Sequence, residues 1–200
     1  VLTASNAWKA LGTQSQKNQL IFEKCTGQHQ DISDGEDEPQ FRIVNTDNAM
    51  HWGQKYEPVS TMLYEHNNQT TIEEFGCVPH ESISYLAASP DGIITDMNSS
   101  LYGRMVEIKN IVNRDITGNP KQDYWIQMQL QMEVCDLNDC DFLETRFIEY
   151  ENHEEFLADS DPSDPLGMTT LDGKQKGFIL QFDKLGVPQY EYAPFGMDKA

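Results

Sequence analysis

The stretch SPDGIITDMNSSLYGRMVEIKN, residues 89–110, decides the fold, because it holds two short apolar runs with charged residues inside them. Side chains alternate across a strand, so we expect Val106 and Ile108 to point into the core. Glu107 and Lys109 then share the opposite face. Charges inside a strand cost stability, and this cost indicates that the two residues line a functional surface.

The two runs are expected to pair as a hairpin about the turn MNSS. Asp96 then faces Tyr102. The same register places Asp91 opposite Glu107. Cross-strand Cβ atoms lie about 4.5 to 5.5 Å apart, a separation that one hard cation can bridge through oxygen ligands. We therefore expect a site for Mg2+, with Mn2+ as a substitute, completed by the carbonyl of Ile108.

Lys109 would lie where its ammonium can orient a water molecule at this site or help to remove its proton. Two carboxylates, a cation and a lysine are suited to the hydrolysis of phosphodiester bonds. A simpler interpretation fits the three residues equally well. Glu107 and Lys109 can be an exposed pair on a strand, and Asp91 can be a turn residue, since Ser-Pro-Asp-Gly strongly favours a turn.

The remaining sequence predicts an α/β protein with a mixed sheet. Helices are expected over residues 3–11, 12–25, 47–66 and 121–135, and Trp125 and Met128 should face the core in the last of them. Strands are expected over residues 77–89, 91–97, 104–110, 141–150, 176–182 and 188–195.

Composition and cysteine spacing limit the setting of the protein. No apolar run approaches the roughly 18 residues of a membrane span, and the N-terminus carries no basic-then-apolar signal pattern. We therefore expect an intracellular protein without a membrane partner, and the start at Val1 suggests further residues upstream. The four cysteines, at positions 25, 77, 135 and 140, form no close pair, so reduced thiols are expected.

Asp91 followed by Glu-Ile-Lys at 107–109 resembles the metal motif of the PD-(D/E)xK nuclease superfamily. Further motifs follow in order, and the chain is similar to the YqaJ-type viral recombinases, the branch that contains the phage lambda exonuclease. The resemblance implies a restriction-endonuclease-like core, a mixed central β-sheet flanked by helices. The matching segments are LTASNAW (2–8), WGQKYEP (52–58), SPDG (89–92), VEIK (106–109) and YWIQMQLQM (124–132).

The resemblance also assigns roles outside the metal motif. Glu57 matches the family's catalytic helix glutamate, and Gly53, one turn earlier, leaves room for metal or DNA. Gln127 matches a helix glutamine that helps to hold the water, the lysine or the scissile phosphate. Ser5, with Thr3, matches the element that takes a terminal 5' phosphate. Each residue also has a simpler interpretation: Glu57 as a surface carboxylate, Gln127 as an ordinary polar residue of the helix surface, and Ser5 as a plain N-cap. The upstream Arg that the family uses to bind phosphate is not in this chain.

The activity implied by the resemblance is a Mg2+-dependent exonuclease that digests one strand of duplex DNA from its 5' end. Such an enzyme would leave a 3' overhang for a single-strand annealing protein in viral-type recombination and repair, at the site of DNA replication in the nucleus or cytoplasm of a host cell. A ring-shaped homo-oligomer around DNA is implied as well, and a monomer is the alternative. Two other functions stay open: a structure-specific or restriction-type endonuclease, and a catalytically silent DNA-binding subunit.

The net charge of -19, from 14 basic and 33 acidic residues, argues against a polyanionic partner if it is spread evenly. Two acidic stretches, near residues 30–40 and 151–165, are expected to be exposed loops of a single nuclease domain spanning residues 1–200. Five cations lie in or next to the matching segments and are expected to form a focused positive groove: Lys9, Arg104, Lys109, Arg114 and Lys121.

Overall fold

The structure, a computed structural model, describes residues 1–26 and 45–194 and has the predicted α/β architecture. The acidic stretch predicted as a loop near residues 30–40 lies outside the described residues. The elements in chain order are β1 (Leu2–Thr3), α1 (Ala4–Ala7), the 3-10 helix η1 (Trp8–Leu11), α2 (Gln14–Thr26), α3 (Ala49–Asn68), β2 (Val78–Pro79), β3 (Leu86–Ala88), β4 (Gly92–Ile93), β5 (Met105–Asn110), α4 (Gln122–Cys135), β6 (Cys140–Thr145), α5 (His153–Ala158), β7 (Ile179–Lys184) and β8 (Val187–Tyr192).

Strand β5 is the centre of the fold, with β4 antiparallel on one side and β6 parallel on the other. The β4–β5 ladder pairs Gly92 with Val106. This is the register predicted from the sequence, because one step further it places Asp91 opposite Glu107. A second sheet has the order β1-β3-β2, and β7 pairs with β8 in a separate hairpin.

The connection between β4 and β5 is longer than the predicted MNSS turn. Backbone bonds from Ser99 N to the Asp96 carbonyl and from Tyr102 N to the Ser99 carbonyl form successive turns. Gly103 then follows with a φ of +77°, a left-handed conformation that glycine adopts without strain. The expectation that Asp96 faces Tyr102 on paired strands is therefore wrong, although the register nearer the site is correct.

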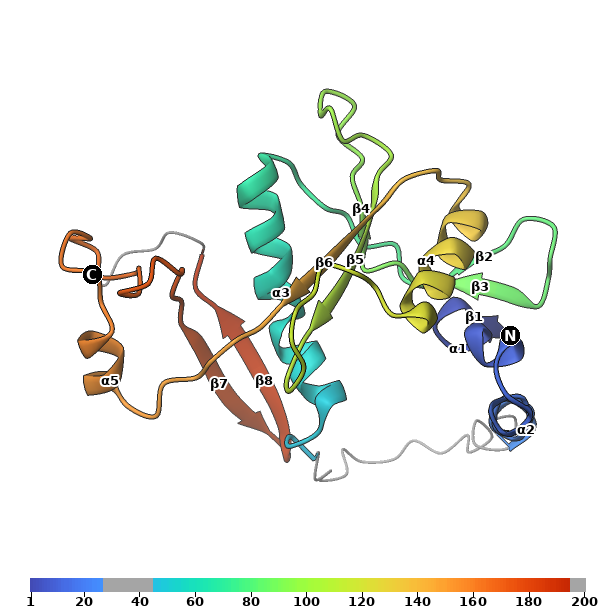
Figure 1. Ribbon diagram of the computed structural model, residues 1–200, viewed down its shortest axis with the longest axis horizontal. Coiled ribbons are helices and arrows are strands. Elements are labelled where there is room, and N and C mark those ends of the chain that lie inside the picture. Colours follow the sequence, from blue (N-terminus) through green and yellow to red (C-terminus); the bar gives the residue numbers. More distant parts are fainter. Residues whose placement is uncertain (27–44, 195–200) are drawn as a thin grey trace.

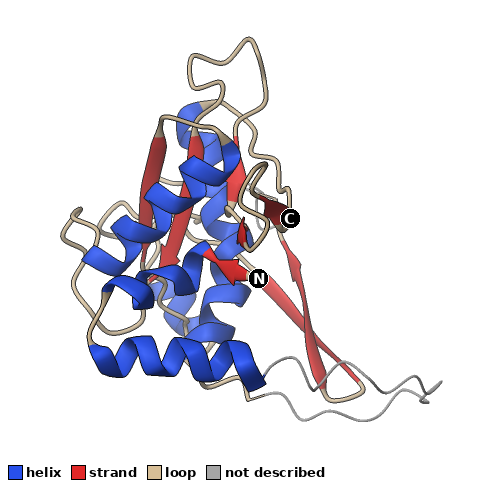
Figure 2. Cartoon of the chain, turned by 90° about the vertical axis from the view of Figure 1, so that its right-hand side faces the viewer, coloured by secondary structure: helices blue, strands red, loops and turns tan. Residues whose placement is uncertain are grey.

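Helices α3 and α4 lie on opposite sides of β5 (Figure 1). On the α3 side, Val106 and Ile108 pack against Tyr64 and Ile94 in the core, as predicted. On the α4 side, Glu107 is 0% exposed, so the face predicted to be an open surface is covered. Seen from the side of α4, helices cover the central strands (Figure 2). A strand between two helical layers is buried on both faces, which the alternation of charged residues did not reveal.

Helix α4 covers β5 with a partly polar face. Its buried residues include Gln127, Met128 and Gln131. Trp125 is 53% exposed, so the prediction that it faces the core is wrong. The helix instead turns two glutamines toward a buried charge on β5, described below, which requires hydrogen-bond donors at this interface.

The stretch 151–165 was predicted to be an exposed loop, but its first part forms the helix α5. Asn152 caps this helix by accepting a hydrogen bond from the backbone N–H of Glu155, and two acidic residues in the first turn favour the positive end of the helix dipole. Phe156 is buried and anchors the helix. The acidic composition of this stretch predicted a loop, although the stretch contains an N-cap residue, Asn152, and one buried apolar residue, Phe156.

The C-terminal hairpin packs against α3 through tyrosines of β8. The Tyr190 hydroxyl lies 2.7 Å from Nε2 of His51, and the Tyr192 hydroxyl donates to the carbonyl of Lys55 at 2.7 Å. None of the described helices is long and apolar enough to cross a membrane. All four cysteines are unpaired, as predicted from their spacing.

Candidate active site

A pocket of about 330 Å3 opens between the N-terminal half of α3 and the strand β5. It brings together side chains from the three segments on which the prediction rests: α3, the turn before β4, and β5. A Cβ built on Gly53 would meet nothing within 4 Å, so the helix backbone is open to the pocket at this point. The pocket is lined by Ala49, Met50, Gly53, Gln54, Glu57, Asp91, Ile108, Lys109, Asn110, Ile111 and Tyr124.

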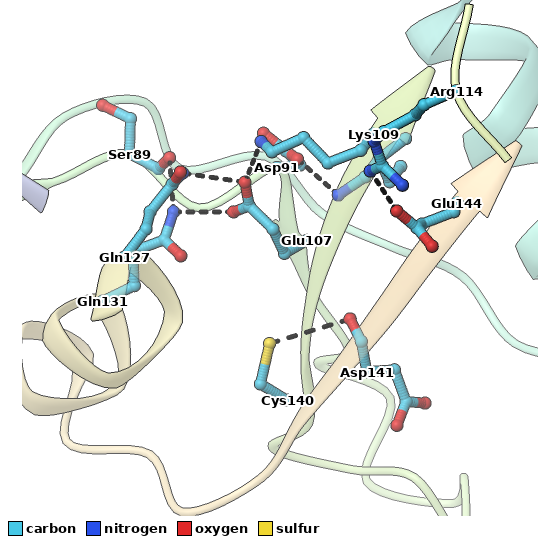
Figure 3. A network of polar contacts seen from close by, with 11 residues as sticks. Ser89, Asp91, Glu107, Lys109, Arg114, Gln127, Gln131, Cys140, Asp141 and Glu144 are labelled. Carbon is cyan, nitrogen blue, oxygen red and sulfur yellow. Dashed lines mark hydrogen bonds and ion pairs between the residues drawn. The ribbon is translucent and has the colours of Figure 1, made fainter. Parts of the chain in front are cut away.

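Glu107 is buried and does not itself line the pocket. Donors hold both of its carboxylate oxygens (Figure 3). Its Oε1 accepts from the ammonium of Lys109 and from Nε2 of Gln127, the latter at 2.7 Å. Its Oε2 accepts from Nε2 of Gln131 at 2.9 Å. A fully buried carboxylate is tolerated only when it is paired and hydrogen-bonded, and one cation and two amides meet that requirement.

Asp91 lies beside Glu107, and its Oδ2 accepts the backbone N–H of Ile108 at 2.6 Å. Burial, and then repulsion by Glu107, raise the pKa of Asp91 to about 7, against the opposing effect of Lys109. Burial and the neighbouring carboxylates also raise the pKa of Glu57. Three acidic groups therefore crowd into one partly buried space, which favours the binding of a positive charge.

The donor set fits a hard divalent cation. Mg2+ and Mn2+ prefer carboxylate and carbonyl oxygens, which Asp91, Glu107 and the Ile108 backbone supply. Across residues 1–26 and 45–194, no three His, Cys, Asp or Glu side chains gather closely enough to hold a metal ion. A cation at this place would therefore depend on the backbone carbonyl as well as on the two carboxylates.

Lys109 is the positive charge of the pocket. Burial acts to lower the pKa of its ammonium, but the neighbouring Glu107 and Asp91 outweigh it and raise the pKa. Its Nζ also lies 5.2 Å from the centre of the Tyr124 ring, within the range of a cation–π contact. Lys109 therefore keeps its proton at neutral pH.

The structure does not bring Thr3 and Ser5 to the pocket, since neither lines it. Their hydroxyl oxygens lie 3.2 Å apart at the start of α1, and Asn6 Nδ2 donates to Thr3 Oγ1 at 3.3 Å. Thr3 occupies the N-cap position, but its side chain makes no capping bond. The predicted phosphate-binding role of the two hydroxyls stays a prediction.

The prediction that five cations form a positive groove is wrong for four of them, because these four are paired with carboxylates. Lys121 is exposed and has no ion-pair partner within the described part of the chain. The four pairs are Lys9 with Glu23, Arg104 with Asp141, Lys109 with Glu107, and Arg114 with Glu144.

Asn110 is a site residue that the sequence analysis missed. Its Nδ2 donates to the carbonyl of Gly53 on α3 at 2.8 Å, and its Oδ1 accepts from Ser60 Oγ at 2.6 Å and from Thr145 Oγ1 at 2.7 Å. These bonds join α3 to β5 and β6 on both sides of Glu57, so they fix the face that α3 turns to the pocket. Its position directly after Glu-Ile-Lys was the available signal.

Gln131 is the second residue that was missed. The sequence places it four positions after Gln127, which is one helical turn. The helix spacing alone therefore puts the two amides on one face, whereas Gln129, the second glutamine of the matching segment, points elsewhere and is exposed.

Comparison with known proteins identifies one family, a relative by sequence and solved structures of similar fold. The family model of the YqaJ-like viral recombinase domain matches residues 1–138. An uncharacterized protein of Acanthamoeba polyphaga mimivirus is 35% identical over 144 residues, which is 66% of this chain and 26% of that protein. The chain thus spans about a quarter of the length of this relative.

Solved structures of similar fold include the alkaline exonuclease of Laribacter hongkongensis, with a TM-score of 0.53 and 27% identity over 72% of this chain and 69% of that one. The same enzyme in complex with dAMP gives a TM-score of 0.51 and 29% identity, covering 72% of this chain and 68% of that one. These matches confirm the predicted PD-(D/E)xK-type α/β fold.

Proposed function

The chain belongs to the YqaJ-like viral recombinase domain family, and from this membership we propose that it is a metal-dependent deoxyribonuclease acting on the ends of duplex DNA. The observation that carries the proposal is the convergence of Asp91, Lys109 and Glu57 on one pocket, with the buried Glu107 bonded to Lys109. The Laribacter hongkongensis enzyme, an alkaline exonuclease whose structure includes a complex with dAMP, supports a DNA substrate and an exonucleolytic mode.

Asp91 and Glu107, with the carbonyl of Ile108, would hold Mg2+, or Mn2+ in its place. Bound there, the cation would polarise a phosphate ester and lower the pKa of a water molecule. Lys109 keeps its proton because Glu107 and Asp91 raise its pKa, so it orients water or stabilises negative charge and is not the base.

Glu57 is the proton acceptor that the geometry favours. It lines the same pocket, and burial raises its pKa toward the range in which a carboxylate is an effective general base. Gln127 keeps Glu107 oriented through the 2.7 Å bond to Oε1 and is therefore a positioning residue.

End-labelled linear duplex DNA and circular duplex DNA, each with and without Mg2+, test the proposal. We expect Mg2+-dependent loss of the linear substrate alone, and no cleavage by Asp91→Asn or Glu107→Gln. The matched control is Asp96→Asn, an exposed carboxylate of the same hairpin outside the pocket, which should cleave like the wild type. Nicking of the circle would indicate an endonuclease, and wild-type cleavage by either site variant would refute the site.

The finer parts of the proposal concern polarity and assembly. We propose digestion from the 5' end, in recombination or repair with a single-strand annealing protein where DNA replicates in a host cell. Substrates labelled at the 5' or at the 3' end separate the two polarities, because only one label is released first. Light scattering combined with a DNA-trap processivity assay tests the ring-shaped assembly: a monomer that digests long duplexes processively would refute it.

A further inference from the structure

Gln131 is a polar residue in a position that normally belongs to the core. It lies on α4 facing β5, and its side chain is 1% exposed. Burying an amide costs free energy unless hydrogen bonds compensate, so a core position usually carries an apolar residue. The contacts of Gln131 therefore have to explain why an amide occupies this place.

Both hydrogens of the amide are used, and they go to two different parts of the site (Figure 3). Nε2 of Gln131 donates to Oε2 of Glu107 at 2.9 Å and to the backbone carbonyl of Ser89 at 3.2 Å. Ser89 lies two residues before Asp91. One side chain thus connects the strand that carries Glu107 to the turn that carries Asp91.

The other polar atom of Gln131, its amide oxygen, shows that the arrangement is costly. Its Oε1 is buried and has no hydrogen-bond partner in the described part of the chain. An amide flip would not help, since it would direct Oε1 at the carboxylate of Glu107 and the carbonyl of Ser89, which are both acceptors. A residue chosen for the stability of the helix interface alone would not leave this atom unpaired.

We propose that Gln131 is a positioning residue for the metal site, which fixes the carboxylate of Glu107 from the Oε2 side and holds the Asp91 turn at the matching distance. The inference rests on the proposed metal-dependent function. Lys109 and Gln127 hold Oε1, so Gln131 is the side chain that prevents the carboxylate from rotating about its own axis. Partners of metal ligands are commonly worth about 10- to 100-fold in metal affinity or activity.

Metal binding to the purified protein tests this role without any DNA. Isothermal titration with Mn2+ should show affinity about 10-fold or more weaker for Gln131→Met, which keeps the approximate volume of the side chain and removes both donors. Gln129→Met is the matched control, because Gln129 is exposed on the same helix, and its Mn2+ affinity should equal that of the wild type. Equal affinity in Gln131→Met and Gln129→Met would overturn the proposal.

A stability measurement separates positioning from simple packing. Without metal, Gln131→Met leaves Oε2 of Glu107 buried and unpaired, so it should lower Tm more in the wild-type background than in Glu107→Gln, where no buried charge is left. The same fall in both backgrounds would show that Gln131 only fills space.

A measurement on the unmodified protein covers the case in which Gln131→Met does not fold. In NMR spectra the side-chain amide of Gln131 should exchange slowly with solvent and shift on addition of Mg2+, while that of Gln129 exchanges fast and does not shift. An unshifted Gln131 amide in metal-saturated protein would refute the inference and leave the proposed function standing. If the wild type binds no metal at all, the proposed function fails first.

Discussion

Raising the pH should destabilise the metal-free protein in one defined window, because burial and Glu107 raise the pKa of Asp91 from 3.8 to about 7. Between these two values the folded state holds a proton on Asp91 that the unfolded state has lost. The free energy of unfolding therefore falls as the pH rises through the window. Three pH units at about 1.4 kcal/mol each give an upper limit of about 4 kcal/mol for this group.

A divalent cation at the proposed site would compete with that proton, so metal affinity should depend on pH in the opposite sense. Below pH 7 the apparent affinity for Mg2+ is expected to rise about tenfold per pH unit, and above it to level off, because Asp91 must ionise before it can bind. Metal binding below this pH should also release a proton, which titration in buffers of different ionisation enthalpy detects.

Urea unfolding with a chelator present, at half-unit steps from about pH 4 to about pH 8, measures the first effect. The control is Asp91→Asn, which keeps the shape and does not titrate. The surface carboxylates contribute equally in both proteins, so the difference between the two curves reports Asp91 together with Glu107 and Glu57, whose charges interact with it. Parallel curves would refute the assignment of the raised pKa to Asp91.

Three further results are expected. Lys109→Ala should lower turnover about 10²- to 10⁴-fold while Mg2+ affinity, measured by calorimetry, is retained, and loss of affinity would show that the lysine is misassigned. In cleavage assays Mn2+ should replace Mg2+, whereas Ca2+ should support DNA binding with little turnover, and activity that survives a chelator would contradict a metal mechanism. In urea unfolding, Trp125→Ala should lower the free energy of unfolding by less than about 1 kcal/mol because the ring is half exposed, whereas Met128→Ala in the core should lower it by about 2 to 5 kcal/mol. Equal losses in the two variants would contradict the orientation of α4.

The hairpin was the most predictable part of the molecule, because strand alternation and register follow from local rules. The period of two placed Val106 and Ile108 in the core, and the pairing placed Asp91 opposite Glu107. The turn length was not predictable in the same way, since Gly103 can continue or end a strand and the sequence does not say which.

What could not be predicted depends on the second layer of the structure. The burial of Glu107 requires α4 to lie over it, and nothing within VEIK encodes a contact some twenty residues away. The same contact explains Trp125, because α4 turns its two glutamines toward the carboxylate of Glu107, and its largest apolar residue is then exposed. Gln131 was predictable in principle from its spacing to Gln127, but only once the charge that both amides face was known.

The pairing of the cations changes how this acidic chain can attract DNA. Glu57, Asp91 and Glu107 outnumber Lys109 around the pocket, and most basic side chains expected nearby are already bound to acids. A phosphate that approaches the metal-free site therefore meets a net negative electrostatic field. Within a Debye length of about 8 Å, salt screens this repulsion only weakly. A bound divalent cation would invert that field. Lys109 is the one basic residue among the described residues that line the pocket, so we expect the metal to bind before the scissile phosphate. Protonation of Asp91, which should weaken metal binding at low pH, should then weaken DNA binding as well.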